Sequence, residues 1–235
     1  MEERFSRTAL IIGESGVEKL RSCRVAIFGV GGVGSFAAEA IARMGVGHIT
    51  LIDNDVVAES NLNRQLIALN STIGRNKVDV AKERILDINP DADVEAICKF
   101  YLPENADEID VSRFDCIVDA IDTVSAKLEL ITRANAAGVN IISSMGTGNK
   151  LHPEMLEFTD ISKTSICPLA RVMRRELKAR GIAHLPVVYS KEEPIPTAKD
   201  AFLPNGKKTV GSISFVPSSA GLLIASKVLE MLLTK

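Results

Sequence analysis

The sequence predicts an α/β fold, a doubly wound, Rossmann-like parallel sheet with helices on both faces. Two observations carry this prediction. Short apolar segments alternate with helical patterns from residue 24 to about residue 144. A Gly-x-Gly-x-x-Gly loop follows the first apolar segment directly. After about residue 148 the alternation breaks down, and a smaller, irregular C-terminal part is expected to complete the sheet.

The elements of the first part follow from their hydrophobic periods. The chain is expected to open with a helical arm of about twenty residues. The expected strands, rich in apolar and β-branched residues, are 24–28, 48–52, 94–100, 115–121 and 140–144. Three helices are expected from apolar residues three and four apart. One begins after Gly32, and the other two cover 77–88 and 125–137.

The second part has weaker signals, and one domain over residues 1–235 is expected, with a nucleotide-binding core at about 24–148 and a substrate and dimer part at about 149–235. The elements expected there are a strand at 155–158, a helix at 169–180, a strand at 187–189, a Pro-containing loop at 193–208 and a closing helix at 217–233.

Composition excludes several classes of protein. The net charge of −2 argues against a protein that coats nucleic acid. The charged start, MEER, leads into no apolar signal region. The late apolar stretch is interrupted by Lys227 and Glu230, so a cytoplasmic protein with no membrane association is expected. No two of the four cysteines form C-x-x-C, and Cys98 and Cys116 are expected to be buried in strands.

The glycine loop reads GVGGVGS at 29–35 and predicts phosphate binding at the start of a helix. Asp53 follows Gly34 by 19 residues (53 − 34), which is the offset of the ribose-binding acid in a nicotinamide-binding fold. Taken alone, these two features predict a dinucleotide site.

The loop after Asp53 favours a nucleoside triphosphate instead. It supplies two cations, Arg64 and Lys77. A triphosphate carries about four negative charges, and fixed Arg and Lys donors are the usual means of holding them. Asp119 and Asp122 lie at the carboxyl end of a predicted central strand, where open α/β sheets bind ligands. A carboxylate in that place can hold magnesium against the phosphates.

Five motifs in this order resemble those of the ubiquitin-activating-enzyme-like superfamily, the ThiF/MoeB/HesA type. They are G-x-G-G-x-G-S at 29–35, D-x-D at 53–55, S-N-L-x-R-Q at 60–65, G-x-x-K at 74–77 and D-x-x-D at 119–122. The resemblance covers about residues 4–148 and implies adenylation, the attack of a carboxylate on the α-phosphate of ATP with release of pyrophosphate. It implies that Asp53 binds ribose, that Arg64 and Lys77 bind phosphates, and that Asp122 holds Mg²⁺. The nucleotide-binding set implied in this way is Gly29, Gly31, Gly32, Gly34, Asp53, Asp55, Asn61, Arg64, Gln65 and Lys77.

The N-terminal arm adds a further implication. Its R-F-S-R at 4–7 resembles the R-Y/F-x-R arm of the same superfamily. There the second arginine reaches the triphosphate bound by a neighbouring subunit. The resemblance therefore implies a homodimer and nominates Arg7, with Arg64, Lys77 and Asp122, as a catalytic residue.

The second half resembles one branch, the tRNA threonylcarbamoyladenosine dehydratases, in D-I-S-K-T at 160–164, P-L-A-R at 168–171, V-Y-S at 188–190 and G-S-I-S-F-V-P at 211–217. This implies ATP-dependent cyclisation of threonylcarbamoyladenosine in tRNA: the threonyl carboxylate is adenylated, and a ureido nitrogen closes an oxazolone ring with loss of AMP. Two alternatives stay open. One is adenylation of a ubiquitin-like sulfur carrier, whose activators commonly carry the zinc cysteines that this chain lacks. The other is an NAD-binding or non-catalytic module, against which Arg64, Lys77 and Asp122 argue.

The helix expected at 169–180 places Arg171, Arg174, Arg175 and Lys178 on one face, with Leu169, Val172, Met173 and Leu177 available for the other. The cationic face is a candidate for tRNA phosphates, and an ordinary solvated face is the alternative.

Cys167 stands at the start of this helix, where a thiol can be a nucleophile that forms a thioester or accepts sulfur from a cysteine desulfurase. The favoured alternative is that ring closure needs no protein nucleophile. A monovalent cation, Na⁺ or K⁺, at the loop 211–217 is left open.

Overall fold

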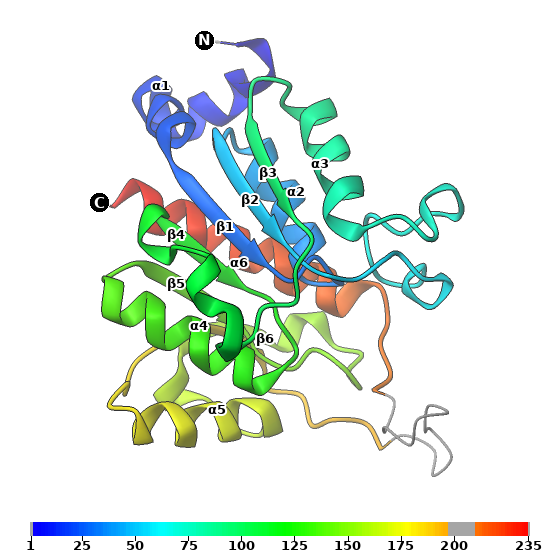
Figure 1. The fold of residues 1–235 in the computed structure, drawn as a ribbon, viewed down its shortest axis with the longest axis vertical. Helices are drawn as coiled ribbons and strands as arrows, with labels where there is room; N and C mark the ends of the chain where they lie inside the picture. The colour runs from blue at the N-terminus through cyan, green and yellow to red at the C-terminus, as the bar shows by residue number, and fades with distance from the viewer. Residues whose placement is uncertain (1, 197–209, 235) are drawn as a thin grey trace.

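A computed structural model describes residues 2–196 and 210–234, so most of the loop expected at 193–208 lies outside the described residues (Figure 1). The strands are β1 (Arg24–Phe28), β2 (His48–Ile52), β3 (Asp93–Ile97), β4 (Cys116–Asp119), β5 (Asn140–Ser144), β6 (Leu156–Asp160) and β7 (Pro186–Ser190). The α-helices are α1 (Ser6–Ser22), α2 (Gly34–Arg43), α3 (Lys77–Ile88), α4 (Val124–Ala137), α5 (Pro168–Ala179) and α6 (Phe215–Leu233).

The seven strands form one sheet in the order β3-β2-β1-β4-β5-β7-β6. All neighbours run parallel except β6, which pairs with β7 antiparallel at the edge. The doubly wound α/β fold predicted from the sequence is confirmed, and the C-terminal part completes the sheet through β7 and β6.

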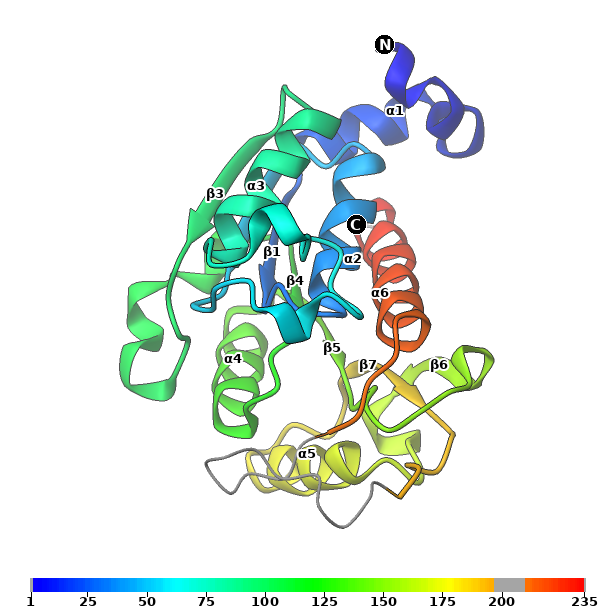
Figure 2. The same cartoon turned by 90° about the vertical axis from the view of Figure 1, so that its right-hand side faces the viewer.

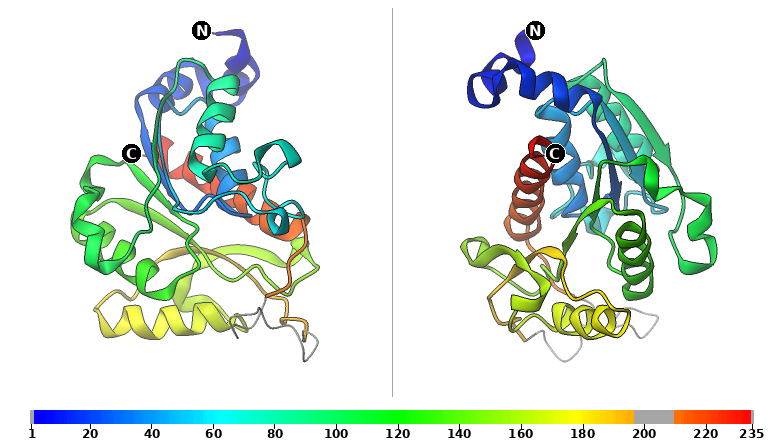
Figure 3. Two further views of the ribbon diagram at one scale, coloured as in Figure 1. Left: turned by 45° about the vertical axis from the view of Figure 1, so that its right-hand side comes forward. Right: turned by 90° about the vertical axis from the view of Figure 1, so that its left-hand side faces the viewer.

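Helices cover both faces of the sheet (Figures 2 and 3). Side chains alternate along β1, so Val25 and Ile27 pack with α2, α3 and α6. Phe28 lies on the opposite face and packs with α4, α5 and the turns between 103 and 113. The near-continuous apolar strands are those of a parallel sheet buried on both faces.

Two expectations about the end of β3 were wrong. The strand ends at Ile97 rather than at Phe100, and Cys98 is exposed instead of buried. The chain leaves the sheet there, because the Lys99 N–H turns back to the Ile97 carbonyl at 3.0 Å. The residues that follow cross the carboxyl edge of the sheet and become available to a ligand.

The closing helix α6 packs deep in the fold. By length and composition it could cross a membrane, but Ala220, Ile224 and Val228 are fully buried among the residues that cover one face of the sheet. Gly221 allows a close approach to α2, since a Cβ at this position would lie 2.9 Å from the Cβ of Phe36. The apolar composition of α6 is therefore that of a core helix.

The arm α1 lies at the amino-terminal edge of the sheet, because it ends immediately before β1 begins (Figure 1). Gly13, with φ 77°, bends it. Phe5 and Ala9 are buried beside Val17, whereas Leu10 and Ile11 are 87% and 86% exposed. The helical arm is confirmed, and it carries apolar side chains that the rest of the described chain does not cover.

The order of the strands positions the site. The chain leaves β1 for α2 on one face and leaves β4 for α4 on the other, although β1 and β4 are neighbours. This divergence is a topological switch point, where open α/β sheets form a crevice at the carboxyl ends of their strands.

Candidate active site

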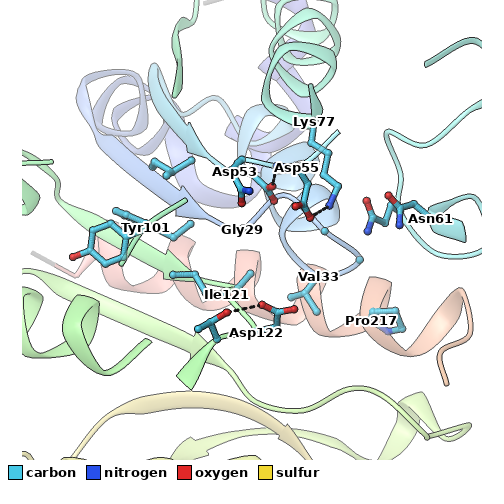
Figure 4. Close-up of a pocket in the computed structure, with 18 of the residues that line it drawn as sticks. Gly29, Val33, Asp53, Asp55, Asn61, Lys77, Tyr101, Ile121, Asp122 and Pro217 are labelled. Carbon is cyan, nitrogen blue, oxygen red and sulfur yellow. Dashed lines mark hydrogen bonds and ion pairs between the residues drawn. The ribbon is translucent and has the colours of Figure 1, made fainter. Parts of the chain in front are cut away.

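A cavity of about 490 Å³ lies at this switch point (Figure 4). Three of the segments that surround it carry the motifs: the glycine loop after β1, the long loop after β2 and the turn after β4. The residues nominated from the sequence that line it are Gly29, Gly31, Gly32, Asp53, Asp55, Asn61, Arg64, Gln65, Lys77 and Asp122. The fold thus gathers three separate motifs around one space.

The glycine loop packs closely against the turn after β4. Gly29 has φ 89°, and a Cβ there would lie 2.6 Å from the carbonyl oxygen of Ala120. Gly34 is nominated as a nucleotide contact but is not among the lining residues, because it begins α2 beneath the loop. A side chain on Gly34 would overlap the Gly29 carbonyl, so this glycine is needed for packing.

Asp53 links the loop after β1 to the loop after β2. Its Oδ2 accepts the Val30 N–H at 2.7 Å, and its Oδ1 accepts the Asp55 N–H at 2.8 Å. A carboxylate offers about four lone-pair positions, so each oxygen can accept another hydrogen bond. Asp53 can therefore hold two ribose hydroxyls while it fixes both loops.

The cations come from the loop after β2. Lys77 begins α3, and its Nζ lies 2.7 Å from Oδ2 of Asp55. Arg64 Nη1 donates to the Ser60 carbonyl and to Asn63 Oδ1, both at 2.9 Å. These bonds orient the guanidinium through one nitrogen, and its other donors, on Nη2 and Nε, can meet phosphate oxygens.

Asp122 lies across the cavity from Lys77 and Asp55 (Figure 4). Its Oδ1 accepts the Thr123 hydroxyl at 3.2 Å. Residues 2–196 and 210–234 contain no group of three or more His, Cys, Asp or Glu side chains that could enclose a metal. Mg²⁺ is usually held by one or two carboxylates together with substrate phosphates, so a single acid in a phosphate-sized cavity fits that ion.

The arrangement places the cation of Lys77 on one side of the cavity and the acid of Asp122 on the other. Such fixed groups stabilise the negative charge of a phosphoryl group as it is attacked. The geometry suits chemistry on a nucleoside phosphate.

Comparison with known proteins agrees with this geometry. A sequence profile of the ThiF family matches residues 5–235. The chain belongs to the ThiF family. Among curated relatives, the tRNA threonylcarbamoyladenosine dehydratase of Bacillus subtilis (strain 168) is 43% identical over 99% of this chain and 96% of the relative. The Escherichia coli (strain K12) protein of the same name is 32% identical over 99% and 94%.

Solved structures of the E. coli tRNA N6-threonylcarbamoyladenosine dehydratase share the fold of this ThiF-family chain. The complex with AMP superposes with a TM-score of 0.90 at 32% identity, covering 99% of this chain and 94% of the other. The complex with ATP gives 0.88 at 33% identity, with the same coverage. These relatives therefore support ATP binding by the ThiF-family fold seen here.

The nominated cations on α1 and α5 lie outside the cavity. Arg7 is exposed on α1, at the opposite end of the sheet from the cavity. Arg174 is half-buried and donates to the carbonyl and the hydroxyl of Thr164 at 2.8 and 2.6 Å. Arg171, Arg175 and Lys178 remain exposed on α5.

The opposite face of α5 differs from the expectation at one position. Met173 and Leu177 are buried as predicted, but Val172 is 37% exposed. Ala170, which was not included, is fully buried in its place. Helix α5 packs beside α4, and Ala170, Met173 and Leu177 form the face that joins the buried core.

Cys167 does not line the cavity. It is only 2% exposed at the residue preceding α5, behind the loop that carries Gly146 and Thr147. A Cβ on Gly146 would lie 3.6 Å from its Sγ. The thiol therefore packs beneath the wall of the cavity rather than opening into it.

Sequence reasoning missed several lining residues. Thr147 follows β5, the neighbour of β4, and its strand-end position could have signalled it. Ser212 and Pro217 come from the approach to α6, and no local pattern identifies them. Residues 99–101 were assigned partly to a strand but line the cavity.

Tyr101 shows why this last segment matters. Its ring meets Phe28 edge to face, with centroids 5.0 Å apart. Its buried hydroxyl has no hydrogen-bond partner in the described part of the chain. Burial raises the pKa of Tyr101 to about 12.

Proposed function

We propose that this protein catalyses the ATP-dependent dehydration of N6-threonylcarbamoyladenosine in tRNA through an acyl-adenylate intermediate. The main support is the cavity, which is lined by the glycine loop, Arg64, Lys77 and Asp122. It lies in a ThiF-family chain that aligns over nearly its whole length with dehydratases. ATP and AMP complexes of one such relative support an adenylation step.

Each side chain then has one role. Asp53 binds the ribose hydroxyls, and the N–H groups of residues 31–33 are the loop donors available to the phosphates. Arg64 and Lys77 neutralise charge that builds up when the threonyl carboxylate attacks the α-phosphate and pyrophosphate leaves. Asp122 holds Mg²⁺, which when bound offsets further phosphate charge.

Ring closure follows without a protein nucleophile. An oxazolone contains a ring oxygen, so the urea carbonyl oxygen must attack the acyl carbon, and the expectation of a nitrogen nucleophile is corrected by this atom count. A C–O bond forms, the acyl–phosphate bond breaks, AMP leaves with its electron pair, and a ureido N–H proton is lost. The buried position of Cys167 agrees with this route and gives no support to a thioester or a sulfur-transfer partner.

The active form is proposed to be a homodimer in the cytoplasm. Arg7 lies at the amino-terminal edge of the sheet and the cavity at the carboxyl edge, so Arg7 can reach a triphosphate only in a second copy. The exposed Leu10 and Ile11 beside it supply apolar surface for such a contact.

The proposed tRNA surface is the exposed face of α5. Arg171, Arg175 and Lys178 lie on a helix that begins against the Gly146–Thr147 wall of the cavity. Phosphates of the tRNA stem would meet these cations while the modified base enters the cavity.

The deciding experiment measures AMP formation by the purified protein with ATP and Mg²⁺. The three conditions are no acyl substrate, tRNA bearing threonylcarbamoyladenosine, and a ubiquitin-like carrier ending in Gly-Gly. We expect AMP with the modified tRNA alone, and a product lighter by one water. AMP with the carrier alone would move the assignment to sulfur-carrier activation, and no turnover in any condition would overturn adenylation itself.

A further inference from the structure

Beneath the cavity lies a buried ion pair that the proposed reaction does not use. Lys127 on α4 and Asp119 at the end of β4 have fully buried side chains, with Nζ 2.8 Å from Oδ2. Neither residue lines the cavity. A buried ion pair is weak evidence for stability, because removing two charges from water costs about as much as their attraction returns. Stability alone therefore does not explain why this ion pair lies under the active site.

The Lys127 ammonium has three acceptors on two strand ends. Besides Asp119 it donates to the Ile121 carbonyl at 3.2 Å and to the Ser144 carbonyl at 2.9 Å. An ammonium has three N–H donors, so this set uses all of them. One buried atom thereby joins the turn after β4 to the end of β5.

The joined segments carry the catalytic wall. Ile121 precedes Asp122 directly, and Asp119 Oδ1 accepts the Ile121 N–H at 3.2 Å, so the backbone N–H and the backbone carbonyl of Ile121 are both held. The same turn is bonded to the end of β1, directly before the glycine loop, where the Ala120 N–H donates to the Phe28 carbonyl at 2.8 Å. Ser144 lies three residues before Thr147, which also lines the cavity.

We propose that Lys127 is a positioning residue that holds the Asp122 carboxylate in the geometry needed for the metal–triphosphate complex. It acts through the Ile121 carbonyl and has no contact with the nucleotide. The proposal rests on the proposed function only in assigning magnesium to Asp122. It does not depend on which carboxylate the enzyme activates.

The test uses ATP-analogue binding, which requires no acyl substrate. Calorimetry measures the affinity of the full chain for a non-hydrolysable ATP analogue in Mg²⁺ and in EDTA. The variant Lys127→Met/Asp119→Asn removes both charges, so no unpaired charge stays buried. We expect it to fold and to bind the analogue in EDTA with a Kd within about threefold of the parent's. The factor by which Mg²⁺ lowers that Kd should be at least about tenfold smaller in the variant than in the parent.

An unchanged Mg²⁺ effect in the folded double variant would show that the pair only supports packing and would overturn the proposal. If that variant does not fold, Lys127→Arg decides, since it keeps the charge but cannot place one nitrogen at all three acceptors. A weakened Mg²⁺ effect in Lys127→Arg supports positioning, and a parental effect rejects it. Absence of any Mg²⁺ effect in the parent would overturn both the metal role of Asp122 and this inference, whereas failure of the tRNA assay alone would touch only the proposed substrate.

Discussion

The Nζ of Lys77 lies 2.7 Å from Oδ2 of Asp55 at the edge of the cavity. The two partners differ in exposure: the Lys77 side chain is 6% exposed and the Asp55 side chain 59%. The ammonium is therefore fixed and largely dehydrated, whereas the acid can turn toward solvent. Phosphate oxygens can take the place of Asp55 without moving the cation, which is how a site keeps its electrostatics in place before the reaction.

Lys77→Met tests this arrangement. Loss of a charge-assisted hydrogen bond to phosphate costs about 1.5–3 kcal/mol, so we expect AMP formation to fall by about 10- to 150-fold. Initial rates at varied ATP measure the loss. Lys82→Met, on the same helix but outside the cavity, is the matched control and should retain parental rates. Equal losses in both variants would contradict the assigned role.

Arg7 is tested by mixing inactive variants. Arg7→Ala and Lys77→Met should each lose activity, but a mixed dimer contains one site with the Lys77 of one chain and the Arg7 of the other. One intact site of two gives about half of parental activity for the purified mixed dimer, and about a quarter for an unpurified random mixture. Co-expression with two affinity tags and purification through both gives the mixed dimer. If Arg7 acts within its own chain, every mixed site is defective and no activity returns.

The exposed face of α5 is tested by salt dependence. Arg171→Ala/Arg175→Ala/Lys178→Ala removes three cations, so the slope of log affinity for tRNA against log salt should become shallower by about two to three. Filter binding at several salt concentrations measures it. Arg43→Ala/Lys82→Ala, on α2 and α3, is the control. If the triple variant keeps the parental slope, these three cations do not contact tRNA phosphates and form an ordinary solvated face of α5.

Cys167→Ser should keep ATP-dependent cyclisation. The thiol is buried behind the cavity wall, and the attacking atom belongs to the substrate. We expect rates within about threefold of the parent, because the small change falls in packing rather than in chemistry. Abolished turnover in a folded variant, checked by its unfolding temperature, would instead make Cys167 a nucleophile.

Tyr101→Phe tests the unpaired hydroxyl under the cavity. A buried polar group without a partner costs about 1–3 kcal/mol, so the variant should be as stable as the parent or more stable at pH 7. Burial raises the pKa of Tyr101 from the ordinary 10.0 to about 12. Between these two pKa values the unfolded chain releases the Tyr101 proton while the folded chain keeps it. The free energy of unfolding is therefore unaffected by this group below about pH 10 and falls as the pH rises toward 12.

Urea unfolding of both proteins between pH 7 and pH 11 gives this comparison. Relative to Tyr101→Phe, the parent should lose stability as the pH rises above about 10. A difference that does not change with pH would mean that Tyr101 ionises as readily in the folded chain as in the unfolded one.

Much of the fold follows from local pattern. The glycine loop, the acid after β2 and the continuous apolar runs are each determined within a few residues, and β1, β2, α3 and β5 lie where the periodicity places them. The end of β3 was misjudged because apolar residues continue past Ile97. They serve the cavity there, so hydrophobicity alone did not mark the end of the strand.

The remaining parts of the site depend on contacts that sequence spacing does not encode. Ser212 and Pro217 join the cavity only because α6 packs on α2. Lys127 sits in a helix whose surface charges look alike in sequence, and only the fold shows that its ammonium is buried between two strand ends. Long-range packing, rather than local propensity, decides these positions.

The contact of Gly221 with the start of α2 bears on how the chain could be divided. A side chain at Gly221 would meet the Val33 carbonyl and the Phe36 Cβ, so α6 packs directly against the end of the glycine loop and the start of α2. A fragment of residues 1–148 would lack α6, so its phosphate-binding loop would lose the helix against which it packs. We expect neither half alone to hold a nucleotide, so a chain split after residue 148 would report the reunion of its two fragments by regaining nucleotide binding.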